Sequence, residues 1–181
     1  MSNFISSFDR ALQFVLGVEG GWSDHPADRG GQTNHGITQA TYDEYRRLLR
    51  RPTRSVREIN GSEVREAYHL LFWIPAKCSS MRDALALVHF DWAVNCGVSG
   101  AFRTLQQAIG VTVDGIWGNK SQAALEDYLR RHGEQTLIAV YLELREQYYR
   151  HQALKFPSQQ AFLAGWLNRI AALRQKVGME K

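Results

Sequence analysis

The sequence predicts a mainly α fold that carries one small β or loop element. Apolar residues recur at helical spacing through most of the 181 residues. Glycine, proline, asparagine and aspartate separate these helical stretches, where they end one helix or begin the next. One stretch, residues 20–36, is too rich in glycine and too polar to continue a helix. It is where we expect the β or loop element.

The first half of the chain predicts three helices. An amphipathic helix is expected from residue 4 to about residue 17, before the Gly-rich loop. Thr38 is expected to cap a second helix that runs to about Arg51 and is ended by Pro52. Ser62 is expected to cap a third helix, which closes at residues 73–75.

The second half begins with a helix over residues 81–95 that is apolar nearly all round, which predicts a buried position. Gly97 and Gly100 interrupt it, and helical spacing resumes over residues 101–109.

The remaining elements follow from turn and cap signals. Asp114-Gly115 predicts a tight turn. Asn119 or Ser121 is expected to cap a helix to about residue 131, and a long helix follows over residues 137–154. Ser158 is the expected cap of the last helix. At most one short pair of strands is expected, in the Gly-rich loop or at residues 111–113.

The composition limits the partners. The net charge is +4, which suits an anionic partner, and a cell-wall polymer or a nucleic acid would both satisfy it. The densest basic cluster has the spacing of one solvated helix face, which we favour over a nucleic-acid stripe; its members are Arg46, Arg47, Arg50, Arg51 and Arg54. We therefore expect no nucleic-acid binding.

Metal, thiol and membrane signals are weak. Cys78 and Cys96 lack metal-ligand spacing, and two free, partly buried thiols are favoured, although one disulfide stays open. The histidines near Asp24 and Asp28 fit no zinc pattern, so no metal and no cofactor are expected. No run is apolar enough to span a membrane, and the N-terminus lacks a secretory pattern. The chain is expected to be made in the cytoplasm without a signal peptide.

Glu19 and Asp28 are the candidate catalytic pair. Glu19 follows an apolar helix and precedes Gly20-Gly21-Trp22, a setting that raises a carboxyl pKa and suits a general acid. Asp28 lies in a polar loop and should stay ionised, and the Thr33 hydroxyl is placed to hold a water molecule. Two carboxyl groups with divided roles are what hydrolysis of a glycosidic bond requires. Asp28 as a turn residue or as an ion-pair partner of Arg29 stays open.

The same stretch resembles glycoside hydrolase family 108, a family of muramidases. The family pattern is E-G-G-aromatic followed by P-x-D-x-G-G-x-T-x-x-G-I-T. The matching residues here are Glu19-Gly20-Gly21-Trp22, Pro26, Asp28, Gly30-Gly31, Thr33 and Gly36-Ile37-Thr38. Trp22 stands where Tyr is common. The order Glu, Asp, Thr, Gly-Ile is also similar to that of phage-type lysozymes, although Thr33 comes one position early for them.

The resemblance continues along the chain. Further segments that resemble the family are residues 68–75, 91–97 and 165–169, and residues 114–118 with 123–125 look like the turn of its predicted peptidoglycan domain. The resemblance implies a lysozyme-like helical fold and a single integrated domain over residues 1–181. Residues 1–85 would be the glycosidase half, and residues 86–181 the helical half that resembles the peptidoglycan domain.

The function implied by the resemblance is an N-acetylmuramidase of the endolysin type. Glu19 would be the general acid, and by analogy with phage-type lysozymes Asp28 and Thr33 would position the attacking water. Trp22, Asn34 and His35 would contact the sugar. Asp91 and Asn95 share one helix face, and a groove wall is favoured over a buried network. Trp22 and Trp73 fit sugar stacking or core packing equally, whereas core packing is expected for Trp92, Trp117 and Trp166.

Two other functions stay open. One is a lytic transglycosylase that uses Glu19 alone, and the other is a non-catalytic protein that binds the cell wall. In each case the partner is bacterial peptidoglycan, in the periplasm or on the cell wall. The resemblance to phage lysis systems, with no signal peptide found, implies a holin-like lysis partner or a secretion apparatus. The protein is expected to be a monomer without stable membrane insertion.

Overall fold

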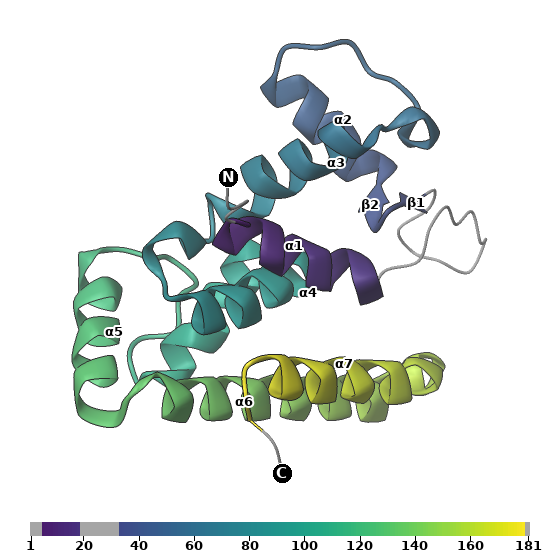
Figure 1. Cartoon of the computed structure of the whole chain (residues 1–181). Helices are drawn as coiled ribbons and strands as arrows, with labels where there is room; N and C mark the ends of the chain where they lie inside the picture. The colour runs from purple at the N-terminus through teal and green to yellow at the C-terminus, as the bar shows by residue number, and fades with distance from the viewer. Residues whose placement is uncertain (1–4, 19–32, 180–181) are drawn as a thin grey trace. The chain divides into compact units, whose positions relative to one another are not determined.

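The structure is a computed structural model, which describes residues 5–18 and 33–179. Over these two ranges the fold is mainly α with one two-stranded sheet, so the predicted fold class is confirmed. The chain divides into two compact units, residues 1–81 and residues 82–181. Figure 1 shows the elements of each unit.

Among the residues that the structure describes, the first unit holds three α-helices, the small sheet and several short helical turns. Phe8 lies on the buried face of its first helix, where its ring centroid is 4.7 Å from that of His69 and 5.4 Å from that of Trp73. The indole Nε1 of Trp73 donates to Ser79 Oγ at 2.8 Å, which identifies Trp73 as a core residue. The elements are α1 (Ser7–Val18), β1 (Thr33–Asn34), β2 (Ile37–Thr38), α2 (Gln39–Leu48), the 3-10 turn η1 (Val56–Glu58), α3 (Gly61–Tyr68), the π-helical turn η2 (His69–Trp73) and the 3-10 turn η3 (Cys78–Ser80).

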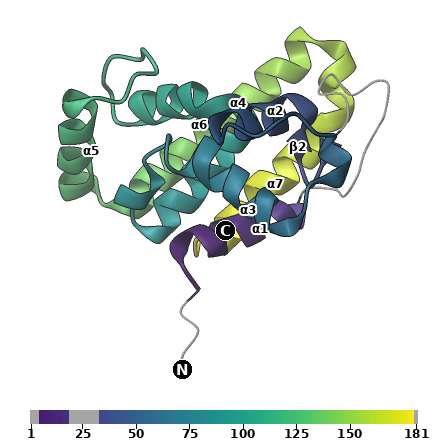
Figure 2. The ribbon, with the colours of Figure 1, turned by 90° about the horizontal axis from the view of Figure 1, so that it is seen from above.

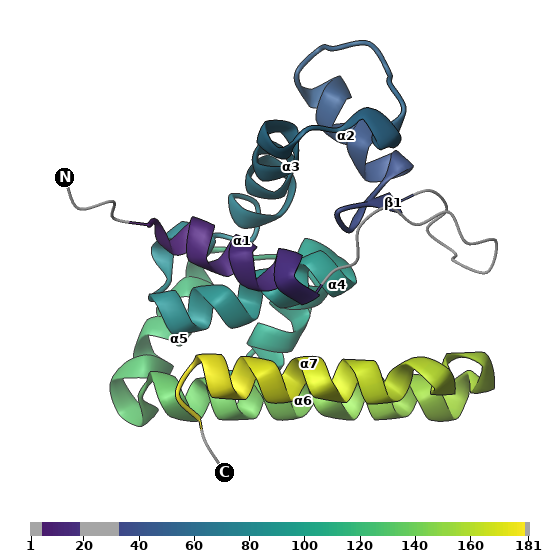
Figure 3. The same cartoon turned by 45° about the vertical axis from the view of Figure 1, so that its right-hand side comes forward.

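The second unit is built from four longer helices. In Figure 3, α6 and α7 lie side by side as an antiparallel pair, and Figure 2 shows the loop that joins α4 to α5. The core includes Trp92, whose ring meets Tyr149 edge to face at 5.3 Å, and Tyr149 in turn stacks on Trp166 at 4.8 Å. The elements are α4 (Asp83–Ala108), α5 (Asn119–His132), α6 (Glu134–Lys155), the 3-10 turn η4 (Pro157–Phe162) and α7 (Leu163–Lys176).

Gly97 divides α4 as the sequence predicts. Its φ of 78° and ψ of 159° are not helical, so two helical segments meet at a kink there. A positive φ suits glycine, which has no Cβ to clash with the backbone.

The predicted turn at Asp114-Gly115 is also present, with Gly115 at φ 77°. Gln106 holds it, because its Oε1 accepts from the backbone N–H groups of both turn residues, at 3.1 and 2.8 Å. Its Nε2 donates to Asp114 Oδ1 at 2.7 Å.

Several predicted helix ends are wrong. The cap of α3 is Asn60 rather than Ser62, because Asn60 and Glu63 form a reciprocal capping box that satisfies two backbone N–H groups at once. Helix α2 ends at Leu48, before Pro52 is reached. Gly118 precedes α5 in place of a polar cap, and Ser158 lies inside η4, so α7 begins only at Leu163.

Candidate active site

The described part of the candidate site is the β1–β2 hairpin. Thr33, Asn34 and His35 belong to it, whereas Glu19, Trp22 and Asp28 lie outside the described residues. The strands pair antiparallel, with Thr33 opposite Thr38 and Asn34 opposite Ile37. The strand pair therefore lies at the end of the Gly-rich stretch, which is one of the two places that the sequence allows, and not at residues 111–113.

The hairpin turn consists of His35 and Gly36. Both have positive φ, 51° and 74°, as a two-residue hairpin turn of the primed type requires. Glycine adopts this conformation without steric cost, and histidine is among the few other residues that enter it with some frequency. The exposed His35 side chain is thus held at the outermost point of the hairpin.

Two hydrogen bonds fix the hairpin to neighbouring elements of the first unit. The Tyr68 hydroxyl, on α3, donates to the His35 carbonyl at 3.0 Å. The Asn34 Nδ2 lies 3.4 Å from the carbonyl oxygens of both Val56 and Arg57, on η1. The Asn34 amide nitrogen is therefore engaged within the protein.

Thr38 joins the hairpin to α2, and its prediction as the helix cap is confirmed. Its Oγ1 accepts from the Thr41 backbone N–H at 3.1 Å. Gln39 then ties the first turn of α2 to the loop beyond it. Its Nε2 donates to the Arg54 carbonyl at 2.9 Å and its Oε1 accepts from the Val56 N–H at 2.7 Å. Together these bonds fix where the hairpin leaves the helix.

A charged network centred on Glu63 holds α2 against α3. The carboxylate is buried and accepts from the Tyr42 hydroxyl at 3.1 Å and from Arg46 Nη1 at 3.2 Å, and it also pairs with Arg54. Burial alone would raise the pKa of Glu63. The Asn60 N–H, the Tyr42 hydroxyl and Arg54 outweigh burial, so the pKa lies below its ordinary value.

This network corrects the interpretation of the arginine cluster. Arg46 is buried and Arg54 is half-buried, so these two guanidinium groups serve the interior rather than a solvated face. Arg47, Arg50 and Arg51 are exposed, as predicted.

Helix α1, which directly precedes Glu19, is held to α3 by an ion pair. Arg65 on α3 forms an ion pair with Asp9, with Nε 2.7 Å from Oδ1. The hydrogen bond from Arg65, followed by the one from Ser6, lowers the pKa of the Asp9 carboxyl below its ordinary value. The segment that carries Glu19 and Asp28 thus begins at an anchored helix and ends at an anchored hairpin.

The structure contradicts the groove-wall interpretation of Asp91. Its side chain is fully buried and pairs with two arginines: Arg145 Nη2 lies 2.5 Å from Oδ2, and Arg169 Nη2 lies 2.8 Å from Oδ1. The alternative, a buried network, is what the structure shows, because a carboxylate in so apolar a helix is tolerated only with compensating charges. Asn95 is exposed, and its Nδ2 donates to the Asp91 carbonyl at 2.6 Å.

Sequence reasoning missed several of these positioning residues. The signal for Glu63 was present, because Asn60 and Glu63 have capping-box spacing. An aspartate in an apolar helix also predicts that a positively charged side chain lies beside it, but nothing in the sequence identifies Arg145 and Arg169 as the partners of Asp91. The role of Tyr68 has no sequence signal.

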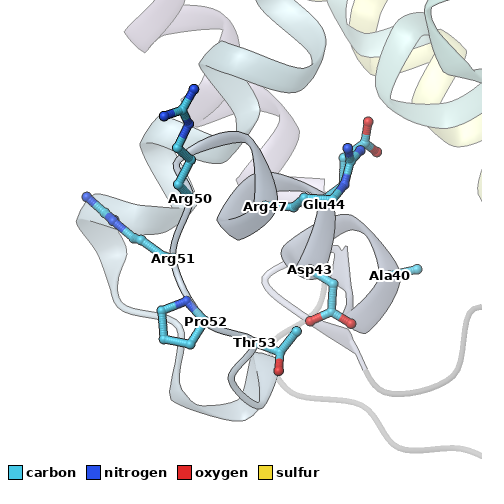
Figure 4. Close-up of a pocket in the computed structure, with 8 residues that line it drawn as sticks. All are labelled: Ala40, Asp43, Glu44, Arg47, Arg50, Arg51, Pro52 and Thr53. Atoms are coloured by element: carbon cyan, nitrogen blue, oxygen red, sulfur yellow. The ribbon is translucent and has the colours of Figure 1, made fainter.

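A separate surface depression of about 770 Å³ lies beside the C-terminal end of α2. Figure 4 shows Arg50 and Arg51 extending from the loop after the helix. The depression contains none of the predicted site residues. Its lining carries charges of both signs, which is typical of a solvated surface. The lining residues are Ala40, Asp43, Glu44, Arg47, Arg50, Arg51, Pro52 and Thr53.

Metal and thiol chemistry have no visible site in the described ranges. Residues 5–18 and 33–179 contain no group of three His, Cys, Asp or Glu side chains placed to hold a metal ion. Both cysteines are free, as predicted. Burial raises the pKa of the Cys96 thiol to about 12 and also raises that of Cys78, so neither is a ready nucleophile.

Comparison with known families decides the identity of the first half. Residues 12–97, which contain the Glu19 motif and the hairpin, match the model of the glycosyl hydrolase 108 family. Residues 12–97 therefore form a glycosyl hydrolase 108 domain. Residues 100–171 match a second model, described as a predicted peptidoglycan domain. The resemblance inferred from the sequence is thereby confirmed for both halves.

The glycosyl hydrolase 108 domain and the segment after it also match a solved structure over nearly their whole length. The structure of Brucella abortus SagA aligns with a TM-score of 0.77 and 27% identity, covering 94% of this chain and 93% of that chain. No curated protein matches the sequence.

The two family models together make this chain a glycosidase that acts on peptidoglycan. Where the helices are described, none is both long enough and apolar enough to cross a membrane.

Proposed function

We propose that the protein is an N-acetylmuramidase that hydrolyses the β-1,4 bond between N-acetylmuramic acid and N-acetylglucosamine. The observation that carries the proposal is the glycosyl hydrolase 108 match over residues 12–97, which includes the Glu19, Asp28 and Thr33 motif. The peptidoglycan domain model over residues 100–171 supports the same polymer as substrate.

Glu19 is the proposed general acid. It follows the last residue of α1, Val18, and the carbonyl oxygens at a helix C-terminus make an ionised carboxylate less favourable. Its neighbours Val18 and Trp22 are apolar or aromatic, which also favours the protonated form. A carboxyl group kept protonated in this way can donate its proton to the departing glycosidic oxygen.

Asp28 and Thr33 are the proposed partners of the attacking water. Asp28 would act as the ionised base, and Thr33, on β1, would hold the same water through its hydroxyl. Such an arrangement inverts the anomeric centre when the two carboxyl groups are roughly 6.5–9.5 Å apart, which leaves room for the water.

Sugar contacts are proposed for Trp22, Asn34, His35 and Asn95. The exposed side chain of His35 and the side chain of Asn34 lie at the hairpin. Asn95 is exposed on α4. Asp91 is not among them, because its carboxylate is buried and paired with Arg145 and Arg169.

The test is a digest of purified peptidoglycan by the wild type and by Glu19→Gln, with the released sugar ends identified by mass spectrometry. We expect reducing N-acetylmuramic acid ends from the wild type and none from the variant. Glu19→Gln keeps the size of the side chain, so binding to the polymer in a pull-down should persist.

Other products would redirect the proposal. Anhydro ends would assign a lytic transglycosylase, in which Glu19 acts alone and Asp28 has no water to position. Binding without release by either protein would leave only a wall-binding function.

We further propose that the enzyme serves phage or prophage lysis as an endolysin and acts as a monomer in the periplasm or on the wall. Access would come from a holin-like partner or from a secretion apparatus. Co-expression with a holin tests this: lysis that requires both proteins supports the holin route, and lysis by the enzyme alone contradicts it.

A further inference from the structure

The connection between α6 and α7 forms an exposed tip on the second unit. Helix α6 ends at Lys155, the 3-10 turn η4 reverses the chain, and α7 starts at Leu163. Figures 1 and 3 show this reversal at the end of the α6–α7 pair that lies away from the C-terminus. We define residues 153–163 as the hairpin tip.

Large apolar side chains are concentrated at the hairpin tip. Leu154 is 83% exposed, Phe162 59% and Phe156 37%, and they are three of the nine large apolar side chains exposed in the described part of the chain. Beside them lies a shallow groove of about 300 Å³, lined by Arg150, Ala153, Leu154, Pro157, Gln160 and Leu163. Exposed apolar side chains that cluster in this way mark an interaction surface more often than scattered ones do.

The one charge carried by the hairpin tip is positive. The stretch between Glu146 and Glu180 contains no aspartate or glutamate, but of its other cations Arg169 pairs with the buried Asp91, and Arg174 and Lys176 stand in the last turn of α7, away from the tip. Lys155 Nζ lies 5.5 Å from the centre of the Phe156 ring. Arg150 stands one turn before the tip and pairs with Glu146 at 2.8 Å. The tip itself, residues 153–163, carries no carboxylate and one lysine.

This combination discriminates between two occupants. A second copy of the chain, docked tip to tip about a two-fold axis, would bring Lys155 against its own symmetry mate with no carboxylate at either tip to neutralise it. An anionic lipid surface satisfies both properties, because phenylalanine and leucine enter the boundary between headgroups and acyl chains while lysine and arginine reach the phosphates.

We propose that the hairpin tip is a peripheral docking site for an anionic phospholipid bilayer. Leu154, Phe156 and Phe162 enter the interface, and Lys155 contacts lipid phosphates. The chain does not span the bilayer in this arrangement. Docking would hold a peptidoglycan-cleaving enzyme at the membrane beside its substrate, a property separate from the cleavage itself.

The test is co-sedimentation of the full-length protein with lipid vesicles. We expect binding to vesicles of phosphatidylcholine mixed with phosphatidylglycerol, weaker binding as salt rises, and little binding to phosphatidylcholine alone. The double variant Leu154→Ser/Phe162→Ser and the charge reversal Lys155→Glu should each lower the vesicle partition coefficient by about tenfold or more. Both changes are at exposed positions, so the circular dichroism spectrum should not change.

Matched variants elsewhere in the chain test whether binding depends on the hairpin tip or only on exposed apolar side chains and net charge in general. Leu48→Ser removes a comparable side chain, 56% exposed, from α2, and Lys120→Glu reverses an exposed charge on α5; both should bind as the wild type does. The proposal is overturned if the wild type ignores anionic vesicles, or if the control variants lose binding as the tip variants do. It is also overturned if light scattering shows a dimer that only the tip variants dissociate, because the tip would then bind a second copy. The assay contains no peptidoglycan, so its result is independent of the muramidase proposal.

Discussion

Glu63 shows how one side chain can position a site that it does not enter. Its carboxylate takes hydrogen bonds from Asn60, Tyr42 and Arg46 and pairs with Arg54. It therefore ties the cap of α3 to α2, the helix that begins where the candidate hairpin ends. A buried carboxylate with this many donors stabilises only as long as all the charges are present, because the buried Arg46 left alone would be a desolvated cation.

We expect Glu63→Gln to lower the free energy of unfolding by about 2 kcal/mol, because it leaves the buried Arg46 without its counter-charge. Glu58→Gln is the matched control, because Glu58 is exposed and its ion pair with Arg54 is long, at 3.9 Å. A pair of this kind contributes little to stability, so this variant should unfold as the wild type does. Urea denaturation of the three proteins measures both. Equal stability of Glu63→Gln and wild type would mean that the network contributes nothing.

The same carboxyl predicts a pH dependence with a definite sign. The folded pKa of Glu63 lies below the ordinary value of 4.5. Its contribution to stability is therefore complete above 4.5 and is lost as pH falls through the folded pKa. The gap between wild type and Glu63→Gln, measured by thermal melts, should be full near neutral pH and should shrink below about pH 4.5. A gap that stays constant on acidification would show that shape and not charge is responsible.

The hairpin and α2 act as one element because they share a residue. Thr38 pairs with Thr33 across the sheet and also caps α2 through its hydroxyl. The turn at His35 and Gly36 and the bond from Tyr68 fix the other end. The element thus presents Thr33, Asn34 and His35 from a support that is hydrogen-bonded at three places.

Thr38→Ala should cost about 1 kcal/mol of stability, because the N–H of Thr41 loses its acceptor. Thr38→Ser keeps the hydroxyl and should retain most of the wild-type stability. Both are compared by urea denaturation. If serine destabilises as much as alanine, the methyl group of Thr38 and not its hydroxyl is the stabilising part.

At the scale of the whole molecule, each unit contains a buried ionic centre that joins different helices. Glu63 joins α2 to α3 in the first unit, and Asp91 joins α4 to α6 and α7 in the second through Arg145 and Arg169. That residues 1–181 form a single integrated domain stays a prediction, and the two centres provide separate probes of it.

If the chain is one domain, differential scanning calorimetry should show one transition, and both Glu63→Gln and Asp91→Asn should move that transition to lower temperature. The reason is that a small domain on its own has a marginal core, so that each half would depend on the other. Two transitions, each moved by only one of the variants, would instead establish two independently stable domains.

The sequence alone determined the fold class and the family, and it limited the short strand pair to two places, the Gly-rich loop or residues 111–113. Helical spacing, the glycines at 97 and 115, and Thr38 act through neighbours a few residues away, so their effects can be derived locally. The Glu19 motif is likewise contiguous, which is why the glycosyl hydrolase 108 match could be anticipated from it.

Only the tertiary structure decided which polar residues are buried and with what. Asp91 meets arginines that follow it by 54 and 78 positions, and the Tyr68 hydroxyl reaches His35 across 33. Helix α2 leaves Arg46 buried and Arg47 exposed, although the sequence presents them as one basic cluster. Side-chain type and spacing fix a local conformation, but the compensation of a buried charge depends on groups that only the fold brings within hydrogen-bond distance.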